Sequence, residues 1–184
     1  MGLDVVEFIM AVEDAFGLDI PHSEAQRLAT PGLVIDYLAA RLPPGGSDAG
    51  ACLSQRAFYK LRRETCARLG VDRSAVRADM LLATLFVGDE GKRAWQDVQI
   101  EVGAAHWPRL GRKPFLCHPL APHLDTFGEA ADFLVTRCPV PVQEDGPGWT
   151  RPQIADVIRR LIHDELAIDQ YTEASEWGRD LGLD

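Results

Sequence analysis

The chain has 184 residues, of which 46% are hydrophobic and 26% are charged, and its formal net charge is −9. This composition is typical of a globular protein with one or two small domains, and no apolar run approaches the roughly 20 residues that span a bilayer. The net acidity opposes nucleic-acid binding, and the acids among the first residues argue against a signal peptide. We therefore expect a cytoplasmic protein without membrane insertion, whose four cysteines are free thiols.

The charge is concentrated at the two ends of the chain. Residues 1–43 carry seven acids and two bases, and residues 150–184 carry eight acids and four bases. Residues 44–149 carry thirteen of each, so the whole net charge lies on the terminal segments. A field of this sign favours a partner with a basic surface.

The first segment predicts three helices. Apolar residues at intervals of three or four positions indicate an amphipathic helix that Gly17 ends. These apolar residues are Val5, Phe8, Ile9, Val12 and Phe16. A short helix is expected from His22 or Ser23 to Leu28. A third helix follows Thr30, a favourable N-cap, and stops before the turn residues 43–48.

The middle segment repeats this pattern. Residues 126–134 resemble residues 30–38 at an offset of 96, and residues 53–71 resemble residues 149–168. Residues 93–103 are the expected counterpart of the first helix, with Trp95 and Val98 on its buried side. We therefore expect residues 52–139 to hold four helical pieces that repeat one structural unit.

The last segment predicts one helix and a long loop. Thr150 is the expected N-cap, Pro152 lies in the first turn, and an apolar stripe follows. The stripe consists of Ile154, Val157, Ile158, Leu161, Ile162 and Leu166. The loop begins at Asp169, with Tyr171 and Trp177 as its expected anchors.

Written tail to head, the two ends of the chain resemble the modification site of the acyl carrier protein family. The tail closes Asp-Leu-Gly-Leu-Asp at residues 180–184, and the head continues Leu-Asp-Val-Val-Glu at residues 3–7. Residues 3–21 are similar to the second helix of that family and its following loop. Residues 30–42 are similar to its fourth helix, and residues 150–184 to its first helix and long loop.

The resemblance implies an all-α fold with an acyl-carrier-protein-like four-helix bundle that is circularly permuted. Residues 1–43 plus 150–184 would form this bundle, and a second, degenerate carrier-like helical bundle at residues 52–139 would be inserted into it. Residues 44–51 and 140–149 would be linkers. New termini in an exposed loop are often tolerated by small domains.

One departure from the family changes the expected function. Gly2, flanked by Asp184 and Leu3 in the joined order, stands where the family has the serine that carries 4′-phosphopantetheine. The matching stretch of the middle segment, residues 88–91, also lacks a serine. We therefore expect no bound cofactor, no thioester chemistry, no catalytic residues and no enzymatic activity.

The resemblance also implies a docking face. The second helix of the family presents acids and exposed apolar side chains to basic partner enzymes. The matching residues are Leu3, Val6, Glu7, Met10, Glu13 and Asp14. The expected function is a non-catalytic binding protein that engages enzymes or regulators of fatty-acid or polyketide metabolism. The competing interpretation makes the acids a solvated face and assigns Val6 and Met10 to the core.

Several alternatives remain open from the sequence. The chain could be a functional acyl carrier modified at a non-standard serine, or a structural or oligomerisation module, either as a monomer or as a domain-swapped dimer. Arginines between residues 56 and 77 predict either a solvated face or a contact with the acidic segments. The set Cys117, His118, His123 and Cys138 lacks the spacing of a zinc site, so no metal is expected.

Overall fold

The computed structural model describes residues 2–46, 52–104, 124–144, 146 and 148–183. These residues form helices, turns and two isolated β-bridges, which confirms the all-α class for this part of the chain. The chain divides into two compact units, one made of Met1–Cys52 with Gln143–Asp184 and the other of Leu53–Val142. We call them unit 1 and unit 2.

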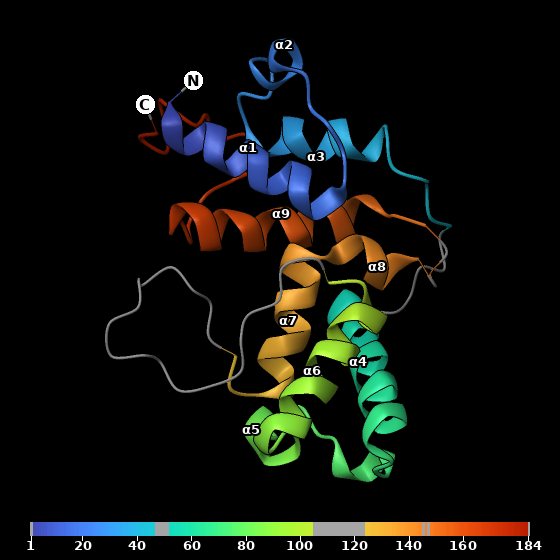
Figure 1. The fold of residues 1–184 in the computed structure, drawn as a ribbon. Helices are drawn as coiled ribbons and strands as arrows, with labels where there is room; N and C mark the ends of the chain where they lie inside the picture. Colours follow the sequence, from blue (N-terminus) through green and yellow to red (C-terminus); the bar gives the residue numbers. More distant parts are fainter. Residues whose placement is uncertain (1, 47–51, 105–123, 145, 147, 184) are drawn as a thin grey trace. The chain divides into compact units, whose positions relative to one another are not determined.

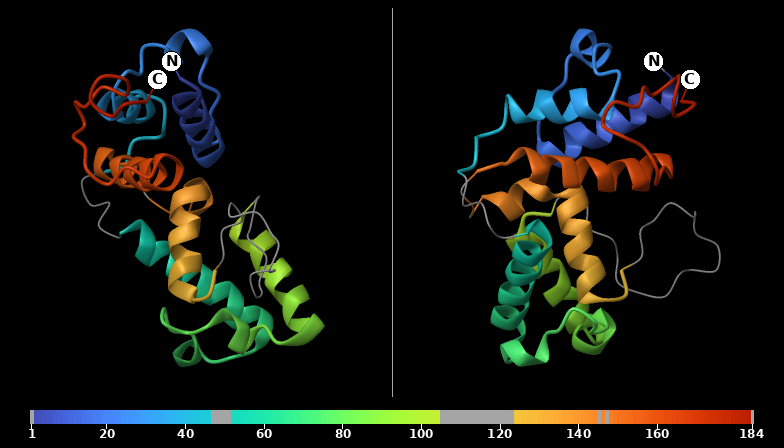
Figure 2. Two further views of the ribbon diagram at one scale, coloured as in Figure 1. Left: turned by 90° about the vertical axis from the view of Figure 1, so that its left-hand side faces the viewer. Right: turned by 180° about the vertical axis from the view of Figure 1, so that it is seen from behind.

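Unit 1 is built from both ends of the chain. Its helices are α1 (Leu3–Phe16), α2 (His22–Ala25), α3 (Pro31–Ala39) and α9 (Arg151–Leu166). Helix α9 packs against α1 and against α3, so the last helix of the chain joins two early ones. The start of α1 and the tail that follows α9 lie side by side in all views (Figures 1 and 2).

The buried stripes of α1 and α9 are those that the sequence predicts. Five apolar side chains of α1 and five of α9 are nearly inaccessible to solvent, because they face each other within unit 1. They are Val5, Phe8, Ile9, Val12, Phe16, Ile154, Val157, Ile158, Leu161 and Ile162. Leu166, the expected end of the second stripe, is only half-buried. Removal of this apolar surface from water is the main stabilising contribution to unit 1.

Threonines begin the helices at the predicted positions. The Oγ1 of Thr30 accepts a hydrogen bond from Leu33 N at 3.3 Å, and α3 begins with a proline. At the start of α9, Gln153 Oε1 accepts from Thr150 N at 3.0 Å. These bonds satisfy backbone groups that a helix terminus otherwise leaves unpaired.

Unit 2 contains α4 (Leu53–Leu69), a short 3₁₀ helix η1 (Arg73–Ala75), α5 (Leu82–Leu85), α6 (Gly88–Val102) and α7 (Phe127–Arg137). Helix α4 packs against both α6 and α7. Helix α6 starts five residues before the expected Arg93, with two acids in its first turn. Trp95 and Val98 are buried, as the sequence predicts.

Helix α8 (Pro139–Gln143) was not expected, because it lies largely in the segment that the sequence suggests is a linker. Its sequence, Pro-Val-Pro-Val-Gln, has a low intrinsic helix propensity. Lys60 Nζ donates to the carbonyl of Pro141 at 2.6 Å, and Val142 is buried. These contacts within unit 2 stabilise a turn that local sequence does not favour.

Both units use the same backbone contact where a helix meets a loop. Gly32 N, in the first turn of α3, donates to Glu173 O at 2.8 Å. Gly128 N, in the first turn of α7, donates to Ala78 O at 2.8 Å. A Cβ atom on either glycine would lie 2.8 Å or 3.1 Å from that carbonyl oxygen, so a side chain is disfavoured at both positions. The two glycines are 96 residues apart in the sequence.

The chain leaves unit 1 after residue 45 and returns before residue 149. The two segments at these points are hydrogen-bonded to each other inside unit 1. Trp149 N donates to Pro43 O at 2.8 Å, and Gly45 N donates to Trp149 O at 2.7 Å, which forms a short parallel bridge. Gly148 has a φ of 94°. A Cβ atom there would lie 2.5 Å from the carbonyl oxygen of Pro44, so only glycine fits.

Substitution Gly148→Ala is expected to destabilise unit 1 by about 2 kcal/mol, since it combines a left-handed backbone with a steric clash. Gly46→Ala is the matched control, because no atom lies within 4 Å of the added Cβ. Urea unfolding followed by tryptophan fluorescence measures both. Equal midpoints for the two variants would contradict the bridge as a structural constraint.

Candidate protein-docking site

The tail of the chain is fixed to the head through Trp177. Its indole Nε1 donates to Leu28 O at 2.6 Å, and its backbone N donates to Ala29 O at 3.1 Å. Its ring lies 5.1 Å from the ring of Phe8, and its carbonyl accepts from Leu183 N at 3.0 Å. Trp177 is therefore the anchor that the sequence predicts, whereas Tyr171 is half-buried and burial raises its pKa.

A pocket of about 480 Å³ lies where head and tail meet. Its apolar lining comes from the start of α1, from the turn after α2 and from the tail. These residues include Gly2, Val5, Leu28, Ala29, Trp177 and Leu183. All of them belong to unit 1, and residues from opposite ends of the sequence form the same wall.

Gly2 occupies the N-cap position of α1 and lines this pocket. The helix has no side-chain cap, because glycine offers neither a hydroxyl nor a carboxylate. The structure thus places Gly2 beside the tail segment, with Leu183 on the same pocket. The neighbouring Asp184 lies outside the described residues.

The predicted docking residues share one face of α1. With 3.6 residues per turn, positions 3, 6, 7, 10, 13 and 14 fall within roughly a third of the helix circumference. Leu3 is 72% exposed and Met10 is 55% exposed, and both Glu7 and Asp14 are exposed. The apolar side chains at the centre of this face are therefore not part of the core.

Two residues of this face are half-buried. Val6 lies at its edge, and Glu13 Oε1 accepts a hydrogen bond from Ile20 N at 2.6 Å. Ile20 is buried, so this bond holds the exit loop of α1 against the bundle. Glu13 thus has a structural contact that the sequence pattern does not reveal.

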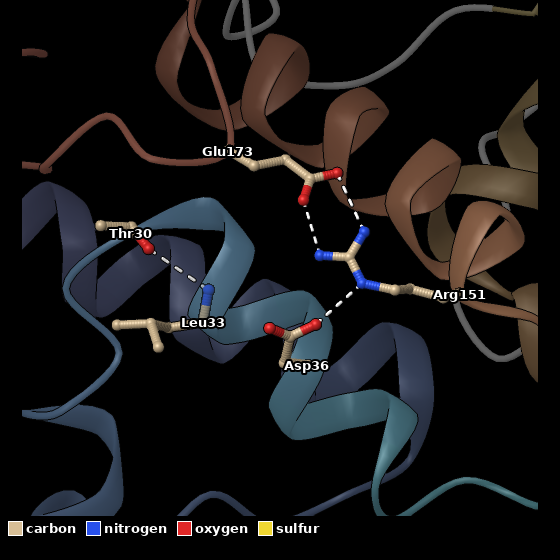
Figure 3. A network of polar contacts seen from close by, with 5 residues as sticks. All are labelled: Thr30, Leu33, Asp36, Arg151 and Glu173. Carbon is tan, nitrogen blue, oxygen red and sulfur yellow. Dashed lines mark hydrogen bonds and ion pairs between the residues drawn. The ribbon is translucent and has the colours of Figure 1, made fainter.

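A polar network fixes the other side of the tail (Figure 3). Arg151, at the start of α9, bonds Asp36 of α3 through Nε at 2.8 Å and Glu173 of the tail through Nη1 at 3.2 Å and Nη2 at 2.6 Å. The hydrogen bonds from Arg151 hold the pKa of Glu173 below its ordinary value, and the two acids raise the pKa of Arg151. Sequence reasoning missed this network, because its partners are far apart in the chain.

Substitution Arg151→Met is expected to lower the free energy of unfolding of unit 1 by about 1 kcal/mol at neutral pH, the upper range for exposed pairs. The pKa of Glu173 is lowered in the folded state, so its stabilisation is present above the unfolded pKa and is lost as pH falls through the folded pKa. The difference between wild type and variant should therefore shrink in acid. Arg159→Met, which removes an ion pair within α9, is the matched control. A difference that is independent of pH would contradict this role.

Other candidate groups do not converge on a site within the described residues. No group of three or more His, Cys, Asp or Glu side chains there could hold a metal ion. Cys117, His118 and His123 lie outside that part of the chain, and Cys138 is buried in α7's C-terminal cap. No helix among the described residues is both long and apolar enough to cross a membrane.

The arginines of α4 contact aromatic and acidic side chains of their own unit. The guanidinium of Arg62 lies 5.2 Å and 4.9 Å from the ring centroids of Phe58 and Tyr59. Arg63 Nε bonds Glu64 at 2.7 Å, and Arg68 pairs with Asp97 of α6. These contacts account for part of the basic segment through cation–π attraction and local charge pairing.

The described residues thus define an all-α protein whose first unit has an acidic, partly apolar helix face beside a head-to-tail pocket. No protein-family model matches the chain, and no solved structure is significantly similar to it.

Proposed function

We propose that this chain is a non-catalytic, acyl-carrier-protein-like binding protein without phosphopantetheine, which engages enzymes or regulators of fatty-acid or polyketide metabolism. The observation that carries the proposal is the outer face of α1, where Leu3 and Met10 are exposed next to Glu7 and Asp14. The partner is a protein with a basic surface, such as an acyl-chain enzyme.

The chemistry of this face supports docking. The opposite side of α1 already provides a complete buried stripe, so the core does not need Leu3 or Met10. Exposed apolar side chains bordered by charges of one sign give a partner both contact area and electrostatic guidance. The concentration of the net charge of −9 on the terminal segments extends the attraction beyond the contact itself.

The identity of residue 2 supports binding without a prosthetic group. Glycine cannot form the phosphodiester of the carrier family, and two of the described serines have local hydrogen-bond partners. Ser74 Oγ donates to Asp72 at 2.6 Å, and Ser175 Oγ accepts from Thr172 N at 3.0 Å. Incubation of the full chain with a phosphopantetheinyl transferase and coenzyme A is expected to leave its mass unchanged. A gain of one phosphopantetheine arm would instead support a functional carrier modified at a non-standard serine.

The docking face is tested with a purified acyl-carrier-dependent ketosynthase that has a basic docking surface. We expect a salt-sensitive complex whose affinity falls by about tenfold when Glu7 and Asp14 are both changed to lysine. Asp19→Lys is the single-site control for charge, because Asp19 is exposed but lies outside α1. An affinity that Glu7→Lys and Asp19→Lys lower equally would argue against a specific face.

A second candidate, an oligomerisation module, follows because unit 1 combines the two ends of the chain. Helix α9 and the tail contact α1 and α3, which lie far from them in the sequence. The α9 and tail of a second copy could make the same contacts. Size-exclusion chromatography with light scattering over a range of concentrations distinguishes the two. A stable dimer that exchanges residues 150–184 would favour the module, and a monomer would favour the docking protein.

A further inference from the structure

Buried apolar side chains line the head-to-tail pocket. One of them is Trp177, whose indole is held by the hydrogen bond to Leu28 O and by ring contact with Phe8. Val5 and Leu28 are also buried. A ligand that enters the pocket therefore meets side chains that are already fixed, which lowers the entropic cost of binding.

The rim of the pocket is polar, with Glu176 and Arg179 among its lining residues. Arg179 lines it, but its guanidinium pairs with Glu176 at 3.5 Å and with Asp180 at 3.3 Å. Asp180 also accepts from Glu176 N at 2.9 Å, and this bond, with that from Arg179, holds the pKa of Asp180 below its ordinary value. Arg179 thus pairs with two acids, of which Asp180 lies next to the lining, so the charged side chains at this end of the pocket include one more acid than base and favour a basic neighbour.

The pocket is continuous with the docking face through the first turn of α1. Gly2 and Val5 line the pocket, and Leu3, between them in the sequence, is the more exposed of the two apolar residues at the centre of the docking face. A partner segment that covers Leu3 therefore passes next to the pocket. The acids of the docking face and Asp180 beside the pocket have the same sign of charge, which is the complement of one basic partner.

We propose that this pocket accepts one apolar side chain of the basic partner segment and gives the docking face its specificity. The inference rests on the proposed function, and it adds the chemistry of the partner: a large apolar residue flanked by lysine or arginine. In protein interfaces such anchors fill pockets at the centre of the contact and supply most of the binding energy.

Selection of short random peptides displayed on phage against the immobilised full chain tests the proposal. We expect enriched peptides with one large apolar residue between basic residues. Changing that residue to alanine should weaken binding by about tenfold. The substitution Ala29→Leu in the chain, which fills the pocket from its rim, should weaken it similarly. Ala40→Leu is the matched control, since Ala40 is exposed at the end of α3 and does not line the pocket.

A spectroscopic measurement reports on the pocket directly. The chain has four tryptophans, and Trp177→Phe assigns the indole N–H resonance of Trp177 in a proton–nitrogen correlation spectrum. The selected peptide should shift this resonance in the wild type and in Ala40→Leu, but not in Ala29→Leu. The same spectra show whether each variant is folded.

The remaining outcomes separate the two proposals. Basic peptides whose binding depends on Glu7 and Asp14, but not on Ala29→Leu, would overturn the pocket and leave the docking face standing. Peptides whose binding is unaffected both by substitution of Glu7 and Asp14 and by Ala29→Leu would overturn both proposals. A selection that returns no basic peptides would do the same.

Discussion

Trp177→Ala is expected to lower the free energy of unfolding of unit 1 by about 3–5 kcal/mol, as deletion of a buried aromatic ring does in other cores. The ring is 5% exposed, contacts Phe8 and donates to Leu28 O, so its removal leaves a cavity and an unpaired carbonyl. Small domains have about 5–15 kcal/mol of total stability, so this loss could leave unit 1 largely unfolded.

Hydrogen exchange read by mass spectrometry measures the effect in each helix. Amides of α1, α3 and α9 should lose protection together, because α9 packs on both of the other helices and the tail closes against them. Trp177→Phe retains most of the apolar contact and should cost less, and Leu33→Ala, at a position that is 45% exposed, should be nearly neutral. Loss of protection confined to residues 169–183 would show that the tail does not contribute to the stability of the helices of unit 1.

A reordered chain with a serine at position 2 is expected to become a substrate for a phosphopantetheinyl transferase. The reordered chain begins at Leu53, runs through Asp184, omits Met1, and continues with serine in place of Gly2 to end at Cys52. Gly2 and Leu183, the described residues nearest the new junction, line the same pocket of unit 1, and the new termini fall at the boundary between the units. Relocation of termini to such boundaries is commonly tolerated.

The expected result is a mass gain of one phosphopantetheine arm on the reordered serine variant. The same reordered chain with Gly2 retained is the control and should not change in mass. Circular dichroism of both establishes that they are helical before the assay. A folded serine variant that remains unmodified would contradict the carrier resemblance at its most specific position, residues 180–184 joined to residues 3–7.

Local features of the fold were predictable from the sequence, because they depend on residues close together in the chain. The stripe from Val5 to Phe16 predicts both the existence and the buried side of α1, and Thr30 predicts the start of α3. Trp177 is predicted as an anchor because a large aromatic residue in a polar loop seldom remains exposed. Helix α8 is not predicted, since its stability depends on contacts such as that from Lys60.

The candidate site was predictable only on the outer surface of α1. The exposed positions Leu3 and Met10 follow from helical periodicity once the buried stripe is known. The pocket does not follow, because its lining combines Gly2 with Leu183 and includes Trp177, which is held by a hydrogen bond to Leu28 O. Contacts between residues so distant in sequence leave no local pattern, and the network of Arg151 illustrates the same limit.

The bridge between Pro44 and Trp149 makes unit 1 a suitable host for domain insertion. The bridge holds the outgoing and returning segments of the chain together before the chain enters unit 2, so an inserted domain needs termini that are as close as these two residues. A fluorescent reporter or a binding scaffold with adjacent ends could replace residues 53–142 while the host retains its own closure. The constraint on the guest is thus the spacing of its ends, and neither its length nor its secondary structure.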